Sequence, residues 1–415
     1  MNWLIKNATI LDPQSSHHKQ VIDLLIKNGK IDQIGQGLSD PKAKVIEAGK
    51  AFLSPGWMDV GVQTGEPGFE HRETLESVAA AAARGGYTAI ASYPNTHPVI
   101  HSKPEVFYLL RKTQDSLVDF HPIGAISQDC AGIDITEMID MHHAGAVAFS
   151  DGNHSLQHAG LMMRALLYVK AFGGLVMNQP QDHTIAGKGQ MNEGLNSLTL
   201  GLKGLPALAE EIMVQRDLFL AEYTNSRLHI TNVSSARSVE LIREAKAKGL
   251  DVTASVAVMN LVFDDEELLN FDTNYKVSPP LREAKDREAL LAGLKDGTID
   301  LINSNHVPLE QEVKDLEFPY AAFGVIGLET AYAAISQLLS TEELVEKLAL
   351  APRRIFDLPV PKIEVGGLAN LTLFDPEAEW SITADQLQSL SRNSPFLEKS
   401  LRGKVIAVFN KGLKI

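Results

Sequence analysis

The chain has 415 residues, 44% of them hydrophobic and 22% charged, a composition typical of a globular protein with a sizeable core. Its formal net charge of −14 disfavours nucleic acid and anionic membrane surfaces as partners, because both would repel it. The single cysteine, Cys130, excludes an intrachain disulfide, and the sequence shows neither a signal peptide nor a membrane-spanning apolar run. We therefore expect a soluble cytoplasmic protein.

Both ends of the chain are predicted to form short β-strands. The apolar run at 21–26 is followed by Lys27-Asn28-Gly29-Lys30 and a second apolar run, and an Asn-Gly pair in this setting favours a hairpin. The last stretch has a similar pattern, with runs at 370–374 and 405–409 and then Asn410-Lys411-Gly412. We expect residues 1–53 and 359–415 to pair in one small β-sandwich domain.

The middle of the chain, residues 54–358, alternates short apolar strands with helical stretches. The predicted strands are Trp57–Val62, Thr88–Tyr93, His121–Ile126, Ala146–Phe149, Gly174–Met177, Leu228–Thr231, Leu250–Ala254 and Ile299–Ile302. Helices are expected at Glu73–Arg84, Ser235–Lys248 and Glu283–Gly293. Eight strands separated by helices predict an α/β fold, a (β/α)8 TIM-type barrel, whose functional side chains lie at the C-terminal ends of the strands.

Several ordered motifs resemble those of bacterial dihydroorotases, which belong to the amidohydrolase superfamily. They are Pro55–Thr74, Arg84–Thr88, Tyr93–Thr96, Phe149–Gly152, Met191–Gly194, His229–Ser235, Ser278–Arg282, Gly297–Asp300 and Phe323–Thr330. The resemblance spans nearly the whole chain and implies hydrolysis of a ring C–N amide bond. In this family a zinc ion, held by histidines and carboxylates at the strand ends, lowers the pKa of a bound water, and a carboxylate takes its proton.

This sequence departs from the family's ligand set at five of six positions. The His-x-His pair of the first strand corresponds to Gly61 and Gln63. The fifth-strand histidine corresponds to Gln179, or to Asn178 if the match slips by one residue, and the sixth-strand histidine corresponds to Asn232. The aspartate that is also the general base corresponds to Asn305. Only Asp151, on the fourth strand, is retained. Glycine offers no ligand, and an amide is an uncharged, weak ligand that is no base at neutral pH.

Substrate contacts implied by the resemblance are altered as well. The arginine that would bind the substrate carboxylate corresponds to Gly65, and two further contact positions are Ser278 and Leu309, whereas Asn95 is retained as a substrate-binding candidate. We therefore expect no catalytic residue and no bound cofactor or metal. The amide side chains at the former ligand positions are expected to hydrogen-bond one another or water.

Histidines elsewhere do not supply a clear substitute site. His154 and His158 are four residues apart and are predicted to share a helix face, whereas the adjacent His142 and His143 point in different directions on a helix. His306, directly after the altered base position, is interpreted as structural.

Three functions remain open. The substitution pattern resembles that of the inactive dihydroorotase homologues of bacteria, which favours a structural or regulatory partner of aspartate carbamoyltransferase in pyrimidine biosynthesis. The first alternative is an active dihydroorotase or other cyclic amidohydrolase with a divergent site, which would again require zinc. The second is a small-molecule binding module that uses Asn95, Asp151 and the amide cluster. Because barrels of this family often pair, we also expect a homo-oligomer.

Overall fold

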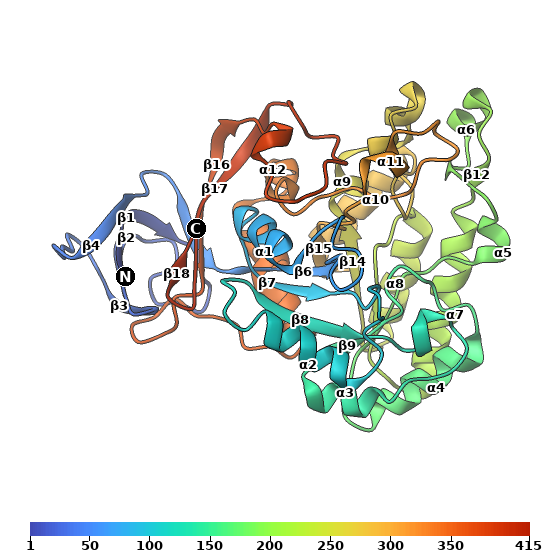
Figure 1. The fold of residues 1–415 in the computed structure, drawn as a ribbon, viewed down its shortest axis with the longest axis horizontal. Coiled ribbons are helices and arrows are strands. Elements are labelled where there is room, and N and C mark those ends of the chain that lie inside the picture. The colour runs from blue at the N-terminus through green and yellow to red at the C-terminus, as the bar shows by residue number, and fades with distance from the viewer.

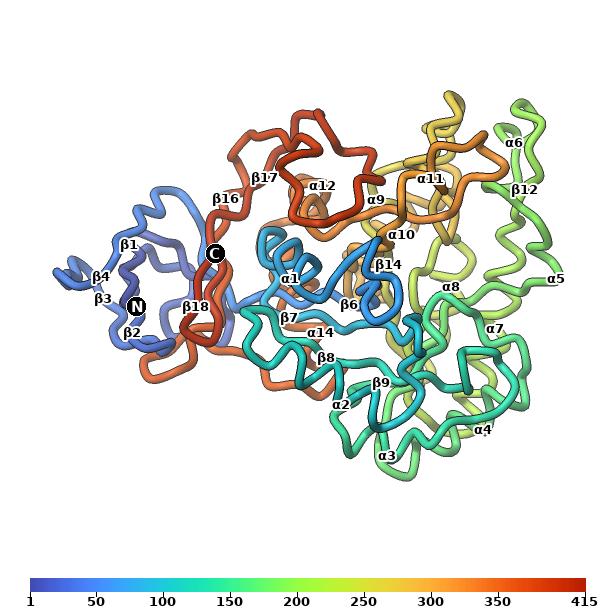
Figure 2. The backbone as a smooth tube through the Cα atoms, in the orientation of Figure 1, coloured from blue at the N-terminus to red at the C-terminus, as the bar shows by residue number.

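The two ends of the chain meet in a β-domain that lies beside a barrel (Figure 1). This computed structural model describes residues 1–415, and both termini lie in the β-domain (Figures 1 and 2). The predicted pairing of the N- and C-terminal segments is therefore confirmed. None of the helices combines the length and apolar character needed to cross a bilayer.

The β-domain is one hydrogen-bonded sheet in the order β18-β17-β16-β5-β1-β2-β3, with β4 paired to β1. Its strands are β1 (Asn2–Ile10), β2 (Val21–Lys27), β3 (Lys30–Gly35), β4 (Ala43–Glu47), β5 (Phe52–Pro55), β16 (Leu371–Trp380), β17 (Leu401–Asn410) and β18 (Leu413–Lys414). The rings of Trp3 on β1 and Phe409 on β17 lie 6.0 Å apart, although β5 and β16 separate these strands within the sheet. The sheet therefore folds over itself, and its two halves enclose a core as the layers of a sandwich do.

Both predicted hairpins form. Asn28 and Gly29 join β2 to β3 with φ of 50° and 76°, and Lys411 and Gly412 join β17 to β18 with φ of 51° and 77°. Positive φ at both central residues of a two-residue turn matches the twist of the flanking strands, and Asn and Gly tolerate it best.

The barrel has eight parallel strands in the order β6-β7-β8-β9-β10-β13-β14-β15. Their bounds are β6 (Trp57–Val62), β7 (Tyr87–Ser92), β8 (Asp119–Gly124), β9 (Ala148–Phe149), β10 (Val176–Asn178), β13 (Leu228–Ile230), β14 (Val252–Ala257) and β15 (Leu301–Asn303). The first and last strands meet where the backbone N–H of Gln63 donates to the carbonyl of His306 at 3.1 Å. The predicted barrel is confirmed.

Helices cover the outside of the barrel (Figure 1). The main ones are α1 (Leu75–Arg84), α2 (Lys103–Lys112), α3 (Met138–Ala144), α4 (Ala159–Lys170), α7 (Leu208–Thr224), α8 (Ala236–Ala247) and α10 (Ala284–Lys295). Shorter helices are α5 (His183–Ala186), α6 (Leu195–Leu200), α9 (Val258–Val262), α11 (Gln311–Lys314), α12 (Ala331–Ile335), α13 (Thr341–Val345) and α14 (Ala351–Ile355), and β11 (Met191–Asn192) pairs with β12 (Gly204–Leu205). Hydroxyl side chains cap the N-termini of two of these helices. The Thr74 hydroxyl accepts a hydrogen bond from the backbone N–H of Ser77 at the start of α1, and the Ser235 hydroxyl accepts one from the backbone N–H of Ser238 at the start of α8.

Residues 381–400, between β16 and β17, leave the β-domain and lie on the barrel near α12 (Figure 2). Ser389 donates a hydrogen bond to Glu73, and the side-chain amide of Asn393 donates to the carbonyl of Val307 at 2.9 Å. This segment, which we call the strap, belongs by its contacts to the barrel, although the sequence pattern assigned it to the β-domain.

Candidate functional site

Three amide side chains meet at the C-terminal ends of the barrel strands. The Nδ2 group of Asn232 lies 3.3 Å from Oε1 of Gln179 and 3.4 Å from Oδ1 of Asn305. Gln179 follows β10, Asn232 follows β13 and Asn305 follows β15, and all three are buried. The strand order therefore brings together three positions at which the resemblance predicts metal ligands, and amide–amide hydrogen bonds join them.

Further polar groups complete this amide cluster. Asn303 donates to Oδ1 of Asn232 at 2.8 Å, Asn305 donates to the carbonyl of Ser278 at 3.0 Å, and Gln179 donates to the Ser278 hydroxyl at 3.3 Å. The backbone leaves both strands with positive φ, 55° at Asn232 and 47° at Asn305, a conformation that asparagine adopts more readily than most residues. Asn303 was not singled out from the sequence, because its role depends on the register of β15 against its neighbours.

Gln179 rather than Asn178 is the fifth-strand side chain at the site. Asn178 donates to a carboxylate oxygen of Asp217 at 2.6 Å and accepts from the backbone of Leu156 at 3.1 Å, so its hydrogen-bonding groups are occupied away from the cluster. Successive side chains point to opposite faces at the end of a strand, which places the next residue on the inner side.

Asp151, the retained acidic position, is held by its neighbours. One carboxylate oxygen accepts from the backbone N–H groups of Ile126 and Ser127, each at 2.9 Å, and the other accepts from the Ser127 hydroxyl. Burial raises the pKa of Asp151, and the hydrogen bonds with Ser127 and Ile126 partly offset this effect. The backbone carbonyl of Asp151 accepts from Asn95 at 3.0 Å, so Asn95 also has a structural partner.

Gly61 leaves space that an aromatic ring fills. Gly61 lies at a bulge in the pairing of β6 with β7 and has a φ of 83°. A Cβ atom placed on Gly61 would come within 2.8 Å of the Tyr93 ring. The Tyr93 hydroxyl is buried, and desolvation raises its pKa above the usual range. Gly65 is enclosed in the same way, since a Cβ there would lie 2.4 Å from the carbonyl oxygen of Glu73. The backbone at these two positions excludes a larger side chain unless its neighbours move.

Two adjoining cavities open at this end of the barrel. The first, which we call the amide cavity, has a volume of about 280 Å³ and is lined by Gln63, Tyr93, Asn153, Gln179, Gln181, Gly187, Gly189, Leu205, Ser278, Asn305, Val307, Phe323 and Gly324. No carboxylate, lysine, arginine or histidine is among them. The second, of about 250 Å³, shares Gln63 and Asn153 with the first and adds Asn95, Arg72, Asp129 and His154. Leu309 lines neither cavity.

The residues present do not fit a zinc ion. No group of three or more His, Cys, Asp or Glu side chains is arranged to hold a metal. Gln179, Asn232 and Asn305 are occupied with one another, and Asp151 points its carboxylate at the backbone after β8. Zinc sites in proteins use imidazole, thiolate and carboxylate ligands, and this cluster offers uncharged amides.

The prediction that His154 and His158 share a helix face is wrong. His158 is the N-cap of α4 and accepts from the backbone of Leu161 at 3.1 Å, whereas His154 precedes the helix and contacts the carbonyl of Cys130 at 3.2 Å. The ring of His142 stacks on Phe172 at 4.8 Å, consistent with a packing role.

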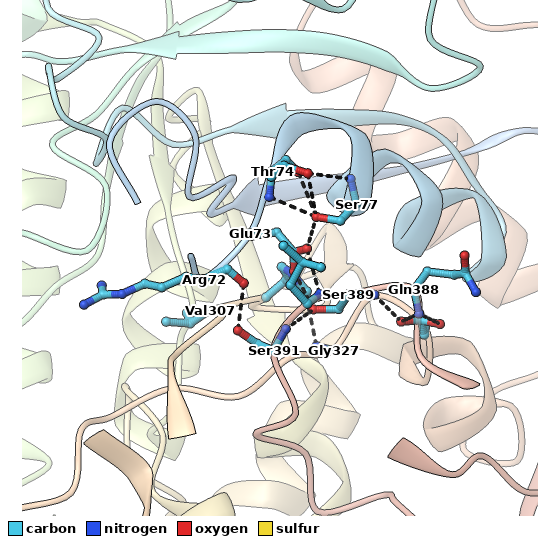
Figure 3. Close-up of polar contacts among 12 residues, drawn as sticks. Arg72, Glu73, Thr74, Ser77, Val307, Gly327, Gln388, Ser389 and Ser391 are labelled. Carbon is cyan, nitrogen blue, oxygen red and sulfur yellow. Dashed lines mark hydrogen bonds and ion pairs between the residues drawn. The ribbon is translucent and has the colours of Figure 1, made fainter. Parts of the chain in front are cut away.

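A second polar network joins the loop after β6, the residues after β15 and the strap (Figure 3). It was not expected from the sequence. Nε2 of His306 lies 3.5 Å from Oε2 of Glu73, and both side chains are buried. Nδ1 of His306 accepts from the backbone of Gly327 at 3.3 Å, so the ring proton sits on Nε2 and faces Glu73. Glu73 also accepts from the hydroxyls of Ser77 and Ser389 and, at 3.1 Å, from the backbone of Leu390.

This network lowers the pKa of Glu73. Burial raises the pKa of the Glu73 carboxyl, but the neighbouring His306 ring and the two serine hydroxyls outweigh burial and leave the pKa below its usual value. Glu73 and His306 are enclosed by the strap and do not line either cavity. The interpretation of His306 as structural agrees with this geometry.

The chain is similar to known proteins over almost its full length. A family model described as Dihydro-orotase-like matches residues 49–238. The dihydroorotase of Geotalea daltonii is 41% identical over 410 residues, covering 97% of this chain and 96% of that protein, and the dihydroorotase of Pelotomaculum thermopropionicum is 42% identical over 409 residues with the same coverage.

Solved structures agree with the barrel. The L-hydantoinase (dihydropyrimidinase) of Arthrobacter aurescens superposes with a TM-score of 0.84 at 26% identity, covering 99% of this chain and 95% of that one. A D-hydantoinase superposes with a TM-score of 0.83 at 25% identity. Identity near 40% over nearly the whole length, with the barrel and its flanking β-domain in common, shows that the chain belongs to the dihydroorotase family.

Proposed function

We propose that this chain is a non-catalytic, metal-free dihydroorotase homologue that serves pyrimidine biosynthesis as a structural or regulatory partner of aspartate carbamoyltransferase. The observation that supports the loss of catalysis is the amide cluster, in which Gln179, Asn232 and Asn305 satisfy one another. An uncharged, internally hydrogen-bonded cluster neither binds a divalent cation nor accepts a proton from water at neutral pH.

Hydrolysis of a ring amide requires an activated water, and the amide cavity is lined by no carboxylate or histidine that could activate one. Asp151 is occupied by Ile126 and Ser127, and Glu73 is enclosed with His306. Arg72, the cation at the second cavity, is paired with Glu310. The residues therefore provide neither a general base beside the amide cavity nor a free cation for a substrate carboxylate.

Metal analysis and an activity assay test the loss of catalysis. We expect protein expressed in zinc-supplemented medium to contain far less than one zinc per chain and to show no dihydroorotate hydrolysis or synthesis, with the Geotalea daltonii dihydroorotase as a positive control. Stoichiometric zinc together with turnover that Asp151→Ala abolishes would overturn the proposal.

Co-purification tests the partnership. We expect this chain, mixed with the aspartate carbamoyltransferase of the same organism, to co-elute with it and to change its activity or thermal stability. Two independent peaks with unchanged carbamoyltransferase activity contradict the partnership.

A second candidate function, small-molecule binding, is favoured by the amide cavity. Its lining carries amide, hydroxyl and backbone groups but no charged side chain, which suits an uncharged cyclic amide rather than an anion. In a thermal-shift series we expect dihydrouracil, which is uncharged, to raise the melting temperature more than dihydroorotate or carbamoyl aspartate. Equal shifts with all three, or none, exclude this use of the cavity.

A further inference from the structure

Three segments project together from one end of the barrel, where α6 and α11 are labelled in Figure 1. They are residues 193–200, 264–275 and 310–320, and we call them the rim. Asn196 donates to Asp265 at 2.8 Å, which joins the first segment to the second. The rings of Phe271 and Phe318, 6.2 Å apart, join the second to the third. The rim is therefore one continuous surface made from three distant parts of the sequence.

The rim exposes several large apolar side chains. Leu195 and Leu198 on α6 are 77% and 78% exposed, and Tyr320 is 74% exposed. Leu269, Phe271 and Leu316 are exposed as well. Single exposed apolar residues are normal on a protein surface, but a group gathered on adjoining projections marks an interaction site.

The same three segments carry carboxylates that form no ion pair. The exposed acidic residues of the rim are Glu193, Glu266, Glu267, Asp272, Glu312, Asp315 and Glu317. None of the seven forms an ion pair, whereas acidic neighbours at the base of the rim do: Asp264 pairs with Arg287, and Glu310 pairs with Arg72. The basic residue within the rim, Lys314, is buried and donates to three backbone carbonyls, of Thr273, Ala322 and Gly324.

Buried polar groups hold the rim in place. Asp265 is buried and accepts from Asn192 and Asn196, each at 2.8 Å. Lys314 clamps 264–275 to 310–320, since the backbone carbonyl of Lys314 also accepts from the Thr273 hydroxyl at 2.9 Å. A surface whose backbone is already fixed loses little conformational entropy on binding.

We propose that the rim is a docking surface for a protein whose face carries apolar side chains bordered by lysine and arginine. Seven unpaired carboxylates repel a second copy of the rim, an anionic membrane and nucleic acid, and they attract a cationic face. The exposed apolar side chains then supply the contact area that charge alone does not. The inference rests on the proposed function in one respect: the aspartate carbamoyltransferase of the same organism is the partner to be tested.

Paired variants test the rim against another surface of the molecule. The rim variants are Leu195→Ser with Leu198→Ser, and Glu266→Lys with Glu267→Lys. The matched controls are Phe219→Ser with Tyr223→Ser on the exposed side of α7, and Asp115→Lys with Glu222→Lys. All of these side chains are exposed, so each variant is expected to fold, which circular dichroism checks.

Binding to the carbamoyltransferase is measured by calorimetry at low and high salt. We expect each rim variant to raise the Kd at least tenfold and each control to leave it within twofold. The wild type is expected to bind more weakly at high salt, and the Glu266→Lys/Glu267→Lys variant to lose part of this salt dependence. Rim variants that bind like the wild type overturn the docking surface and leave the partnership intact.

A second probe separates the rim from the choice of partner. A fluorescent amphipathic helical peptide of leucine and lysine carries the expected chemistry without any carbamoyltransferase sequence. We expect the wild type and both control variants to bind it and both rim variants to bind it at least tenfold more weakly. If the carbamoyltransferase does not bind but the peptide shows this pattern, the partnership fails and the rim is supported. Equal peptide binding by all variants, or none by the wild type, overturns the rim.

Discussion

The ring of Tyr93 occupies the space that a side chain at position 61 needs. A Cβ on Gly61 would lie 2.8 Å from both the ring Cζ and the hydroxyl oxygen of Tyr93, and Gly61 has a φ of 83°. Position 61 is one at which the resemblance predicts a histidine ligand. Because the ring fills this space and the backbone bulges, we expect that a histidine introduced here alone does not form a ligand position.

Gly61→His is therefore expected to destabilise the fold without creating a metal ligand. Overpacking against Tyr93 costs about 1–3 kcal/mol, and a non-glycine residue at positive φ adds roughly 1 kcal/mol or more. Urea denaturation measures the loss, and Gln63→His, whose side chain faces the open cavities, is the control expected to cost far less. A Gly61→His variant as stable as the wild type contradicts the packing argument.

Asn305→Asp is expected to lower stability in a pH-dependent way and to produce no dihydroorotase activity. Asn305 donates to the carbonyl of Ser278, and an aspartate would turn a carboxylate oxygen toward that carbonyl. Its pKa in the folded state would rise above the unfolded value, so the folded state would bind the proton more tightly and stability would fall as pH rises.

At pH 7.5 we expect Asn305→Asp to lose about 1–3 kcal/mol of unfolding free energy, the cost of an unsatisfied buried polar group, and to lose less at pH 5. Asn153→Asp is the control, because Asn153 is exposed at the edge of both cavities. Equal losses at both pH values exclude a titrating carboxylate as the cause.

The barrel was predictable because its signals are local. The run Trp57–Val62 forms β6 as expected, and the Asn28-Gly29 pair forms its hairpin, since strand periodicity and turn chemistry depend on residues adjacent in sequence. The meeting of Gln179, Asn232 and Asn305 was also expected, because all three follow parallel strands of one barrel.

The remaining features depend on contacts between distant segments. Glu73 lies in the loop between β6 and α1, and its partners His306 and Ser389 come from far along the chain. No local pattern identifies such a carboxylate as buried, since a glutamate just before a helix usually lies at the surface. The pairing of Gly61 with Tyr93 is similar: a glycine in a strand suggests a bulge or a close approach, but not what approaches.

Asp59 is expected to make stability depend on pH between about 4 and 6. Its carboxylate accepts from the backbone and the hydroxyl of Ser304, which ties β6 to the end of β15. Burial raises the pKa of Asp59 from 3.8 to about 6, although its hydrogen bonds with Ser304 act in the opposite direction. The folded state binds this proton more tightly than the unfolded state, so the contribution of Asp59 to stability decreases as pH rises through this range.

Comparison with Asp59→Asn isolates this effect. Asparagine keeps an acceptor for the backbone of Ser304 but does not titrate. We expect the wild type to lose up to about 3 kcal/mol relative to the variant between pH 4 and pH 7. Burial lowers the pKa of His229 to about 3, so the contribution of His229 to stability rises with pH, opposite to that of Asp59. Because His229 is present in both proteins, its effect cancels in the comparison. A difference that does not change with pH contradicts a raised pKa at Asp59.

Glu73→Ala is expected to release the strap from the barrel. The substitution leaves His306, the Ser389 hydroxyl and the backbone N–H of Leu390 without their acceptor in a buried site, at a cost of about 3 kcal/mol or more. Because Glu329 still accepts from the backbone N–H groups of Gln388 and Ser389, the strap should loosen first at Leu390. Hydrogen exchange of the Leu390 amide measures this, and Glu76→Ala, at an exposed position on α1, is the control. Faster exchange across the whole chain, rather than at the strap, indicates global destabilisation and argues against a local tether.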